Sequence, residues 1–515
     1  MHHIDDNPYE SPREIGSEGD SGSKENRPWY KLLSRYHWFV LAVCALGWLF
    51  DCLDQQLFIL ARPQAMEDLL GYLKTSPDYK FWTQTFGDIS TSVFIAGWAT
   101  GGLIFGMLGD RIGRAKTMML TILIYSACTG LSALSQTVYD FAFYRFLTGL
   151  GVGGEFAVGV ALVAEVMPTK ARTQALGLLQ ALSAFGNISA ALINLQLGLT
   201  EEEGLPMARW RLMFCIGALP AVLALLIRGR LKEPEKWVQT KVEGKATVQL
   251  GSYAELFGDP VWRKHALLGL LLACSGVIGL WAVGFYTPDL IRDVNLKPAT
   301  AKAYAQLTKD ATETGDAKRA AALEEIRALM EKDPKAKVSE SQGKLKAEVD
   351  AIAKKELAVY QSLTSVMLNM GAFLGIFGFS TLAQRIGRKP TFAIALLAAF
   401  FSTVYVFWSL QHFWQIFVLV PIMGFCQLSL FGGYAVYFPE LFPTRLRSTG
   451  TSFCYNVGRF VAAFGPLVKI GLNYAFSGYG SNALRYAGMT MCAVFLVGLF
   501  VLPFLPETKG KPLPE

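Results

Sequence analysis

Long apolar runs, separated by short charged links, constrain this chain more than any other feature. Each run approaches or exceeds the length of about 20 residues that a helix needs to cross a bilayer. Only 17% of the 515 residues are charged, against about 25% in a typical soluble protein. The runs predict membrane-spanning helices at roughly 37–61, 89–109, 115–135, 140–166, 173–199, 210–228, 264–288, 360–384, 391–410, 413–438, 448–473 and 483–504.

The charges of the links predict an orientation. Lys and Arg gather in the links at 110–116, 170–172, 228–264, 385–389 and 445–447, whereas 135–139 and 411–412 carry none. Basic links face the cytoplasm by the positive-inside bias. We therefore expect a multi-pass protein of the cell inner (plasma) membrane with both termini in the cytoplasm. The expected parts are a disordered tail 1–36, a six-helix bundle 37–228, a cytoplasmic linker 229–263, a second bundle 264–504 and a tail 505–515.

Three polar motifs repeat at offsets within a few residues of 274. They are Arg-Ile-Gly-Arg at 111–114 and 385–388, the set Glu165, Pro168, Thr169 and Arg172 with Glu440, Pro443, Thr444 and Arg447, and Pro234-Glu235 with Pro506-Glu507. Unrelated helices would not keep one offset across three motifs. The pattern predicts an all-α membrane protein of two pseudo-symmetric bundles, with a ligand site near the midplane between them.

The second half also contains a long polar stretch at 289–359. It is rich in Ala, Lys and Glu, and Asp316 to Glu331 is dense in strong helix formers. By topology it lies outside the membrane, as a small extracytoplasmic helical insertion. The default interpretation is a solvent-exposed segment without a specific role, and a binding or capping role stays open.

Other classes of function find little support. The net charge of +7 comes largely from Lys and Arg at helix ends, so it does not indicate nucleic-acid binding. The eight Cys form no Cys-x-x-Cys pair, and neither a metal site nor a cofactor is expected. No nucleophile–base constellation suggests an enzyme.

The segment from Gly106 to Lys116, Gly-Met-Leu-Gly-Asp-Arg-Ile-Gly-Arg-Ala-Lys, resembles the signature loop of the major facilitator superfamily. The resemblance implies twelve helices in two bundles and a monomer. In the second copy Gln384 replaces the acidic residue. We interpret the repeated charges as a cytoplasmic gate, with plain helix-end ion pairs as the alternative. The gate residues are Gly106, Asp110, Arg111, Gly113, Arg114, Glu165, Arg172, Arg385, Arg388, Glu440 and Arg447.

Five ionisable residues lie inside predicted spans: Asp51, Asp54, Arg145, Glu155 and Arg459. Charged groups in hydrocarbon are costly and usually functional. Asp54 and Arg145 lie at similar depths and could pair. We expect Asp51, Asp54 and Glu155 to serve in proton coupling, with a structural pair as the alternative.

Two subfamily resemblances compete. Asp51-Cys52-Leu53-Asp54, the span-4 run from Arg145 to Glu155, and the segment from Pro439 to Arg459 resemble proton-coupled organic-acid symporters, which include the sialate/lactate and aromatic-acid carriers. Pro506-Glu507-Thr508-Lys509-Gly510 resembles the C-terminal signature of sugar porters, but the span-7 amides that would bind sugar hydroxyls are missing around Ser275 and Gly276.

We therefore expect a small organic anion and protons as substrates, with a proton-coupled sugar porter or a transporter-like nutrient sensor as alternatives. Arg459 is the first candidate for a carboxylate, because a guanidinium binds it bidentately. The remaining candidates for substrate binding are Arg145, Gln180, Asn187, Trp281, Tyr286, Gln427 and Asn456.

Overall fold

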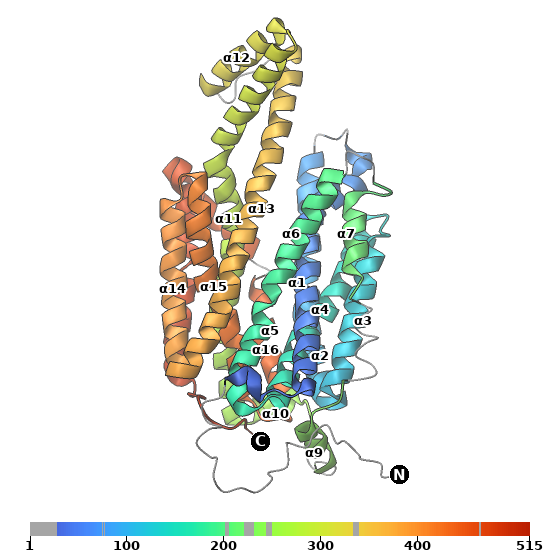
Figure 1. Cartoon of the computed structure of the whole chain (residues 1–515), viewed down its shortest axis with the longest axis vertical. Coiled ribbons are helices and arrows are strands. Elements are labelled where there is room, and N and C mark those ends of the chain that lie inside the picture. The colour runs from blue at the N-terminus through green and yellow to red at the C-terminus, as the bar shows by residue number, and fades with distance from the viewer. Residues whose placement is uncertain are drawn as a thin grey trace.

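The computed structural model describes residues 28–74, 76, 78–200, 205–220, 231–243, 250–332, 339–462 and 465–514. Of the predicted tail 1–36, residues 1–27 lie outside this part, and a 3-10 helix at Trp29–Leu32 precedes α1. The described residues form helices and no strand. Figure 1 shows two upright groups of helices side by side.

The first group contains seven helical elements. A proline-containing α1 and the long α2 are followed by shorter helices, and the predicted fifth span is interrupted at Leu182. The elements are α1 (Arg35–Leu69), α2 (Tyr79–Ile112), α3 (Arg114–Ser132), α4 (Val138–Val166), α5 (Thr169–Ala181), α6 (Ser183–Thr200) and α7 (Arg209–Gly217).

The second group follows two short helices of the predicted linker, α9 (Glu235–Glu243) and α10 (Tyr253–Gly258). Two of its helices are much longer than a membrane span requires. The elements are α11 (Pro260–Glu313), α12 (Ala317–Lys332), α13 (Glu340–Ile386), α14 (Arg388–Ser409), α15 (Ile416–Tyr437), α16 (Arg447–Ala462), α17 (Gly465–Ala475), α18 (Ala483–Met491) and α19 (Val494–Val501).

Nine helical stretches among the described residues are long and apolar enough to cross a membrane. They correspond to all the predicted spans except the third, sixth and eleventh. The third is the 19-residue α3. The sixth, 210–228, lies partly outside the described residues, and the eleventh is divided between α16 and α17.

Close helix packing repeats between the two groups. Gly97 and Gly101 of α2 face the backbone of α4, where any side chain would collide with it. Gly371 and Gly375 of α13 follow them by the offset of 274 found for the polar motifs, and they face the backbone of α15 in the same way. Small residues at this spacing let membrane helices approach closely. The internal repeat therefore extends into the apolar spans.

The predicted insertion is built by extending two spans. The helix α11 runs through position 289 without a break, and α13 runs through 359, so both ends of the insertion are continuous with membrane helices. We call the described residues of 289–359 the tower (Figure 1). The helix predicted at Asp316 to Glu331 is α12, and Leu323 and Ile326 on it are buried in a small core of the tower.

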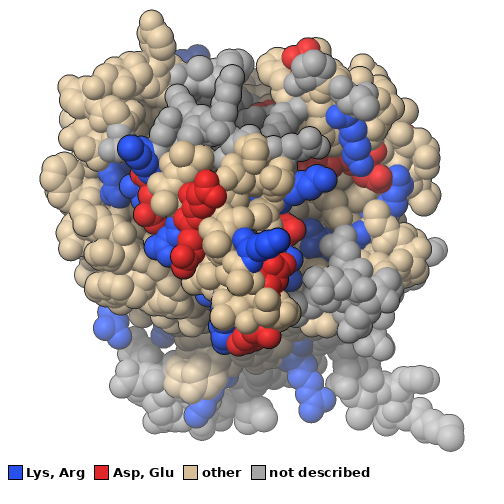
Figure 2. Space-filling model, turned by 90° about the horizontal axis from the view of Figure 1, so that it is seen from above, with Lys and Arg blue, Asp and Glu red and all other residues tan. Residues whose placement is uncertain are grey.

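The surface of the tower mixes both signs of charge. Figure 2 shows Lys, Arg, Asp and Glu interspersed when the molecule is seen from the tower side. Several of these residues form ion pairs, including Lys302 with Glu356 and Arg319 with Glu348. Below, "tower end" denotes the end of the molecule with α12, and "latch end" denotes the opposite end with α10 (Figure 1).

Candidate functional site

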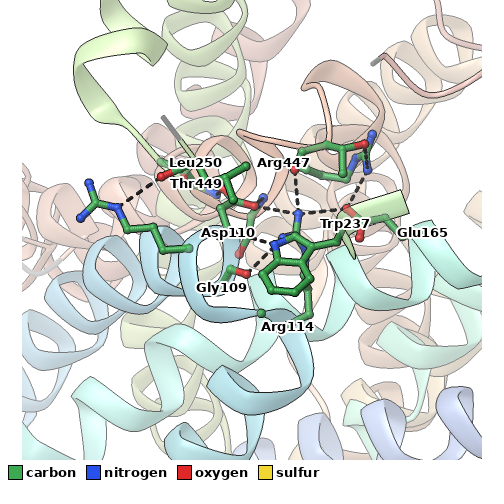
Figure 3. A network of polar contacts seen from close by, with 12 residues as sticks. Gly109, Asp110, Arg114, Glu165, Trp237, Leu250, Arg447 and Thr449 are labelled. Carbon is green, nitrogen blue, oxygen red and sulfur yellow. Dashed lines mark hydrogen bonds and ion pairs between the residues drawn. The ribbon is translucent and has the colours of Figure 1, made fainter. Parts of the chain in front are cut away.

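The link between α2 and α3 is shaped by Gly113. Its φ of 115° and ψ of 153° suit glycine alone, and the turn brings Asp110 at the end of α2 beside Arg114 at the start of α3. The Arg114 Nη2 atom lies 2.9 Å from Asp110 Oδ1, and both side chains are fully buried (Figure 3). The sequence motif thus builds a buried ion pair at the latch end.

Asp110 joins the first group to the second. Its carboxylate accepts hydrogen bonds from the backbone N–H groups of Ser448 at 3.2 Å and Thr449 at 2.8 Å, and from the Thr449 hydroxyl at 2.6 Å. These N–H groups lie in the first turn of α16, where the helix dipole favours a negative charge. An acidic side chain of one group therefore caps a helix of the other.

Glu165 makes a second connection between the groups. Its Oε1 atom lies 3.1 Å from Arg114 Nη2 and 2.7 Å from Arg447 Nη1, and all three side chains are fully buried. Arg114 also donates to the carbonyl of Thr444 at 2.7 Å. We call Asp110, Arg114, Glu165 and Arg447 the first latch (Figure 3).

The repeated residues form a second latch of Gln384, Arg388, Glu440 and Arg172. Arg388 binds Glu440 through two hydrogen bonds of 3.0 and 2.7 Å, but this ion pair stays within the second group. Toward the first group Arg388 contacts only the neutral Thr173 hydroxyl, at 2.9 Å.

Gln384 and Arg172 complete the second latch without an ion pair. Gln384 donates to the carbonyl of Lys170 at 2.9 Å and also contacts Gln174. The Arg172 side chain is buried, and its Nε has no hydrogen-bond partner in the described residues. The glutamates of the two repeated sets therefore pair with arginines outside their own set: Glu165 pairs with Arg447, and Glu440 pairs with Arg388.

Two carboxylates support the starts of α3 and α14. Glu233 accepts from the N–H groups of Ala115 and Lys116, each at 3.2 Å. Glu507 accepts from N–H groups in the first turn of α14, those of Arg388 and Lys389, at 2.9 and 3.0 Å. The structural counterpart of Glu507 is thus Glu233, and not the neighbouring Glu235 of the repeated Pro-Glu motif.

The environment of Glu507 favours its charged form. Burial raises the pKa of this carboxyl, but backbone N–H groups from residues 388, 389, 508 and 509 outweigh burial, so the pKa lies below its usual value. A preference for the charged form is what a helix-capping carboxylate requires.

Residues 250–257 of the predicted linker cross the latch end, and we call them the linker staple. Arg111 Nε donates to the carbonyl of Leu250 at 3.2 Å, and the N–H of Gly251 donates to the carbonyl of Arg445 at 2.9 Å. Arg445 also pairs with Glu255 at 2.6 Å. The staple therefore connects the end of α2 to the loop before α16.

The two remaining predicted gate residues also lie at this end. Gly106 of α2 faces Ser452 of α16, with no room for a side chain. The Arg385 carbonyl accepts a hydrogen bond from Lys509 at 2.7 Å. The latch end is thus held by α2, α16, the linker staple and the C-terminal segment together.

Arg459 lies deeper, about 18 Å from the start of α16 at the helical rise of about 1.5 Å per residue. Its side chain is 2% exposed and lies between the rings of Trp98 and Tyr455, at 4.1 and 4.4 Å from their centroids. The Nη1 atom donates to Tyr455 O at 2.8 Å and Asn456 Oδ1 at 2.9 Å, whereas Nε has no partner. Among the described residues, no carboxylate forms an ion pair with Arg459.

The surroundings of Arg459 belong to both groups. Asn456 donates to the carbonyl of Gly153 on α4 at 3.2 Å. Tyr455 stacks on Phe156 of α4 at a centroid distance of 4.2 Å. Arg459 is therefore a buried cation at the interface between the groups.

A pair of acids lies nearby in the first group. Asp51 of α1 and Glu155 of α4 are each 1% exposed, and their carboxyls are direct neighbours together with the Tyr125 hydroxyl. None of these oxygens has a hydrogen-bond partner of good geometry among the described residues. Gly47 of α1 leaves the space that the Glu155 carboxyl occupies.

Cys52 connects the acid pair with Arg459. Its thiol interacts electrostatically with both Asp51 and Arg459, and it contacts the Ser183 hydroxyl. The structure thus brings an acid pair and an arginine, none of which forms an ion pair with a described residue, into one neighbourhood between α1, α4 and α16.

Asp54 and Arg145 form a different cluster. Arg145 Nη1 lies 3.6 Å from Asp54 Oδ2, and both side chains are fully buried. Thr129 donates to Asp54 at 2.7 Å, and Arg145 donates to Ser132 at 2.6 Å. The Phe214 ring covers the guanidinium at 4.6 Å. All these residues belong to the first group, so the pair joins α1, α3 and α4 and lies apart from Arg459.

The other predicted binding residues fall in different places. Gln180 is buried, and its Oε1 has no partner in the described residues. Asn187 donates to Asn369 of the second group at 2.9 Å, whereas Gln427 bonds Thr403 within the second group at 2.5 Å. Trp281 and Tyr286 belong to α11, but their side chains lie outside the described residues.

Sequence reasoning missed Trp98 and Tyr125, and each had a detectable signal. Trp98 shares a helix face with Gly102 and Gly106, both of which face α16. Tyr125 lies on a polar stripe of α3 with Thr121 and Thr129, at spacings of one helical turn. A polar stripe inside a membrane span indicates contact with other polar groups.

Comparison with known proteins identifies the family of the chain. The family described as Major Facilitator Superfamily matches residues 44–307, and the family described as Sugar (and other) transporter matches residues 320–510. The chain belongs to the major facilitator superfamily. This confirms the predicted fold of twelve membrane-spanning helices in two bundles, and the protein is a membrane transporter.

Two curated relatives carry the names of organic acids. The cis,cis-muconate transport protein of Acinetobacter baylyi is 28% identical over 425 residues, which cover 82% of this chain and 85% of that protein. The sialic acid transporter NanX of Escherichia coli is 26% identical over 439 residues, which cover 84% and 86%.

The fold is also similar to a solved structure. The proton:xylose symporter XylE of E. coli matches with a TM-score of 0.64 at 15% identity, covering 93% of this chain and 98% of that chain. At this identity, the similarity establishes the fold of the superfamily transporter and not its substrate.

Proposed function

We propose that this transporter is a proton symporter of a small organic anion, such as a monocarboxylate, sialate or an aromatic acid. It works by alternating access as a monomer in the inner membrane. The latch end and both termini lie in the cytoplasm, and the tower lies outside.

Arg459 is the observation that carries the proposal. Burying an arginine without a counter-charge costs several kcal/mol, and an anionic partner usually offsets this cost. Arg459 has no such partner among the described residues, lies at the interface between the groups, and keeps Nε unused. A bound carboxylate would supply the missing charge through a bidentate contact.

The acid pair supports proton coupling. Two carboxyls that are neighbours in a buried site cannot both ionise without a large repulsion, so they hold at least one proton between them. Asp51 and Glu155 meet this condition, with Cys52 lying between Asp51 and Arg459. The negative charge of an anion bound at Arg459 and the positive charge of a proton bound at the acid pair then compensate each other.

The closed latch end supports alternating access. Contacts from both latches, the linker staple and the α2–α16 interface join the two groups at this end. The conformation is therefore closed toward the cytoplasm. Inward opening would break the ion pair between Glu165 and Arg447 and uncap α16.

The names of the relatives agree with this substrate class, since both muconate and sialic acid carry carboxylates. A proton-coupled sugar porter is the second candidate, because the sugar transporter family matches 320–510. The sugar-porter signature at 506–510 lies at the latch end, where Glu507 and Thr508 support the second latch. Those residues do not line the neighbourhood of Arg459.

Uptake into proteoliposomes tests the substrate. With an inward proton gradient, labelled muconate, sialic acid, benzoate or lactate should accumulate, and glucose should not. Arg459→Lys should weaken apparent affinity at least about tenfold, because an ammonium cannot make the bidentate contact. Arg319→Lys on the tower surface is the matched control and should transport normally. Glucose uptake alone, or unchanged affinity in Arg459→Lys, contradicts the proposal.

Counterflow separates proton coupling from binding. Glu155→Gln should keep exchange of labelled for unlabelled anion but lose accumulation driven by the pH gradient, because the amide cannot release a proton. Asp51→Asn should behave in the same way. Gradient-driven accumulation at the wild-type level in both variants would rule out the acid pair as the coupling site.

A further inference from the structure

A cavity lies at the tower end of the second group, apart from the interface between the groups. It has a volume of about 750 Å³ and is lined by residues of α11, α14 and α18, including Asp293, Trp408 and Arg485. Its volume lies in the range of small-ligand sites. The transport mechanism makes no use of it.

Arg485 forms the basic side of this cavity. Its guanidinium donates to the carbonyls of Phe407, Trp408 and Leu410, at 2.7, 3.3 and 2.6 Å, and so closes the C-terminal end of α14. These bonds use three of its five N–H groups. The Nε group and one Nη2 hydrogen remain, and the half-buried side chain holds them beside the cavity. This arrangement is a rigid donor fork, typical of phosphate recognition.

Asp293 forms the acidic side. It lies one helical turn after Asp289 on α11, and it makes no hydrogen bond or ion pair with a described residue. Burial and the charge of Asp289 raise the pKa of the Asp293 carboxyl, against the opposing influence of Arg292 and Arg485. Asp293 therefore offers a carboxylate to a cation at the acidic side of the cavity.

The position of the cavity relative to the bilayer indicates the source of its ligand. Phe401, Tyr405 and Trp408 follow one face of α14 and are 63%, 58% and 64% exposed. Exposed aromatic side chains near the end of a membrane helix mark the level of the lipid headgroups. The cavity therefore adjoins the bilayer surface and lies on the lipid side of the second group.

We propose that this cavity binds the headgroup of a zwitterionic aminophospholipid such as phosphatidylethanolamine. The phosphate accepts from the free N–H groups of Arg485, and the ammonium lies against Asp293. Trp408 contacts the glycerol and the start of the acyl chains. The bound lipid joins α11 to α18 and so supports the base of the tower.

Native mass spectrometry of the purified full chain tests this site. The protein is delipidated, then titrated with phosphatidylethanolamine or with phosphatidylglycerol of the same acyl chains. The wild type should retain the first lipid about fivefold better, and Asp293→Asn should remove this preference by deleting the cation site. Asp350→Asn, on the tower and away from the membrane, is the matched control and should keep the preference. Because Asp293 is exposed and unbonded, its variant should fold normally.

Two results would overturn the proposal. One is an unchanged lipid preference in Asp293→Asn. The other is displacement of the lipid by equimolar water-soluble glycerophosphoethanolamine, which would make the cavity a site for free phosphoesters. A readout of lipid retention is independent of uptake, so failure here leaves the proposed transport function untouched, and the reverse also holds.

Discussion

The first and second latches are built from repeated residues, yet they hold the two groups together differently. In the first latch, charges cross the interface: Asp110 caps α16, and Glu165 pairs with Arg447. In the second, the ion pair between Arg388 and Glu440 stays within one group. Arg388 reaches the first group through the neutral Thr173 hydroxyl, and Arg172 is attracted to Glu440 across the interface without forming an ion pair among the described residues. The repeated motif therefore has a similar geometry in the two latches, but the two latches contribute differently to the free energy of closing the latch end.

The difference begins with one substitution. Gln384 stands where Asp110 stands in the first copy. An amide contacts α5 through Lys170 and Gln174 but brings no charge to the helix N-terminus. Among the described residues, the direct charged contacts between the groups through Asp110 and Glu165 therefore lie on the α2–α16 side, and inward opening should depend chiefly on releasing that side.

The largest expected effect separates the two latches directly. Glu165→Gln leaves Arg447 buried without an acid, and breaking such a pair costs about 3–5 kcal/mol. The lost free energy destabilises the closed state, because Glu165 and Arg447 belong to different groups. Hydrogen–deuterium exchange should then rise at residues 447–455.

Glu440→Gln is the comparison for that measurement. It breaks a pair that is also buried, so the melting temperature should fall, but exchange at the start of α16 should stay low because that pair lies within one group. Equal deprotection of α16 in both variants would show that the two latches do not differ as described.

Changing the charge at the two equivalent positions, 110 and 384, should test the difference between the two latches. Asp110→Asn removes the charged cap of α16 and the partner of Arg114, at a cost of about 1–3 kcal/mol to the closed state. Gln384→Asp should do the opposite, stabilising closure by about 0.5–1 kcal/mol through a new charge at the start of α5. The uptake rate and the exchange protection should therefore each change in opposite directions in the two variants. A change in the same direction in both variants would contradict the capping of these helices by a charge.

The linker staple should contribute less. Gly251 has a φ of 62°, and a side chain there would meet the carbonyl of Met107. Gly251→Ala should weaken closure by about 1 kcal/mol or slightly more. Proteolysis of the linker in the folded protein should then become faster. Gly258→Ala on α10, where added atoms meet nothing, is the control.

The smallest effects should be equal in the two halves. Glu233→Gln and Glu507→Gln each remove a charged cap from a helix start, worth about 0.3–1 kcal/mol. Because the pKa of Glu507 is depressed in the folded state, its contribution is complete above the ordinary Glu pKa of about 4.3 and is lost as pH falls through the folded value. Melting temperatures measured from pH 7 to pH 3 should converge for wild type and Glu507→Gln. A constant difference down to pH 3 would argue against the charged cap.

The sequence alone determined the architecture, because span length and the offset of 274 depend only on local composition and on an internal repeat. It also identified every charged residue of the two latches. It could not determine how they pair. Glu165 binds Arg447 rather than Arg172, because that choice depends on how the two groups meet. Glu233 rather than Glu235 matches Glu507, because that choice depends on how the chain returns to the start of α3 within its own half.

The tertiary structure likewise decided which intramembrane charges belong together. Asp51 and Asp54 are three residues apart, yet one neighbours Glu155 and the other pairs with Arg145. Residues at that spacing point in directions about 60° apart on a helix, so different neighbouring helices receive them. Periodicity predicts which face of a helix a charge occupies, but only the packing of the other helices determines whether that charge meets a counter-charge. For Arg459 the described structure offers none, and that is what makes it the candidate anion site.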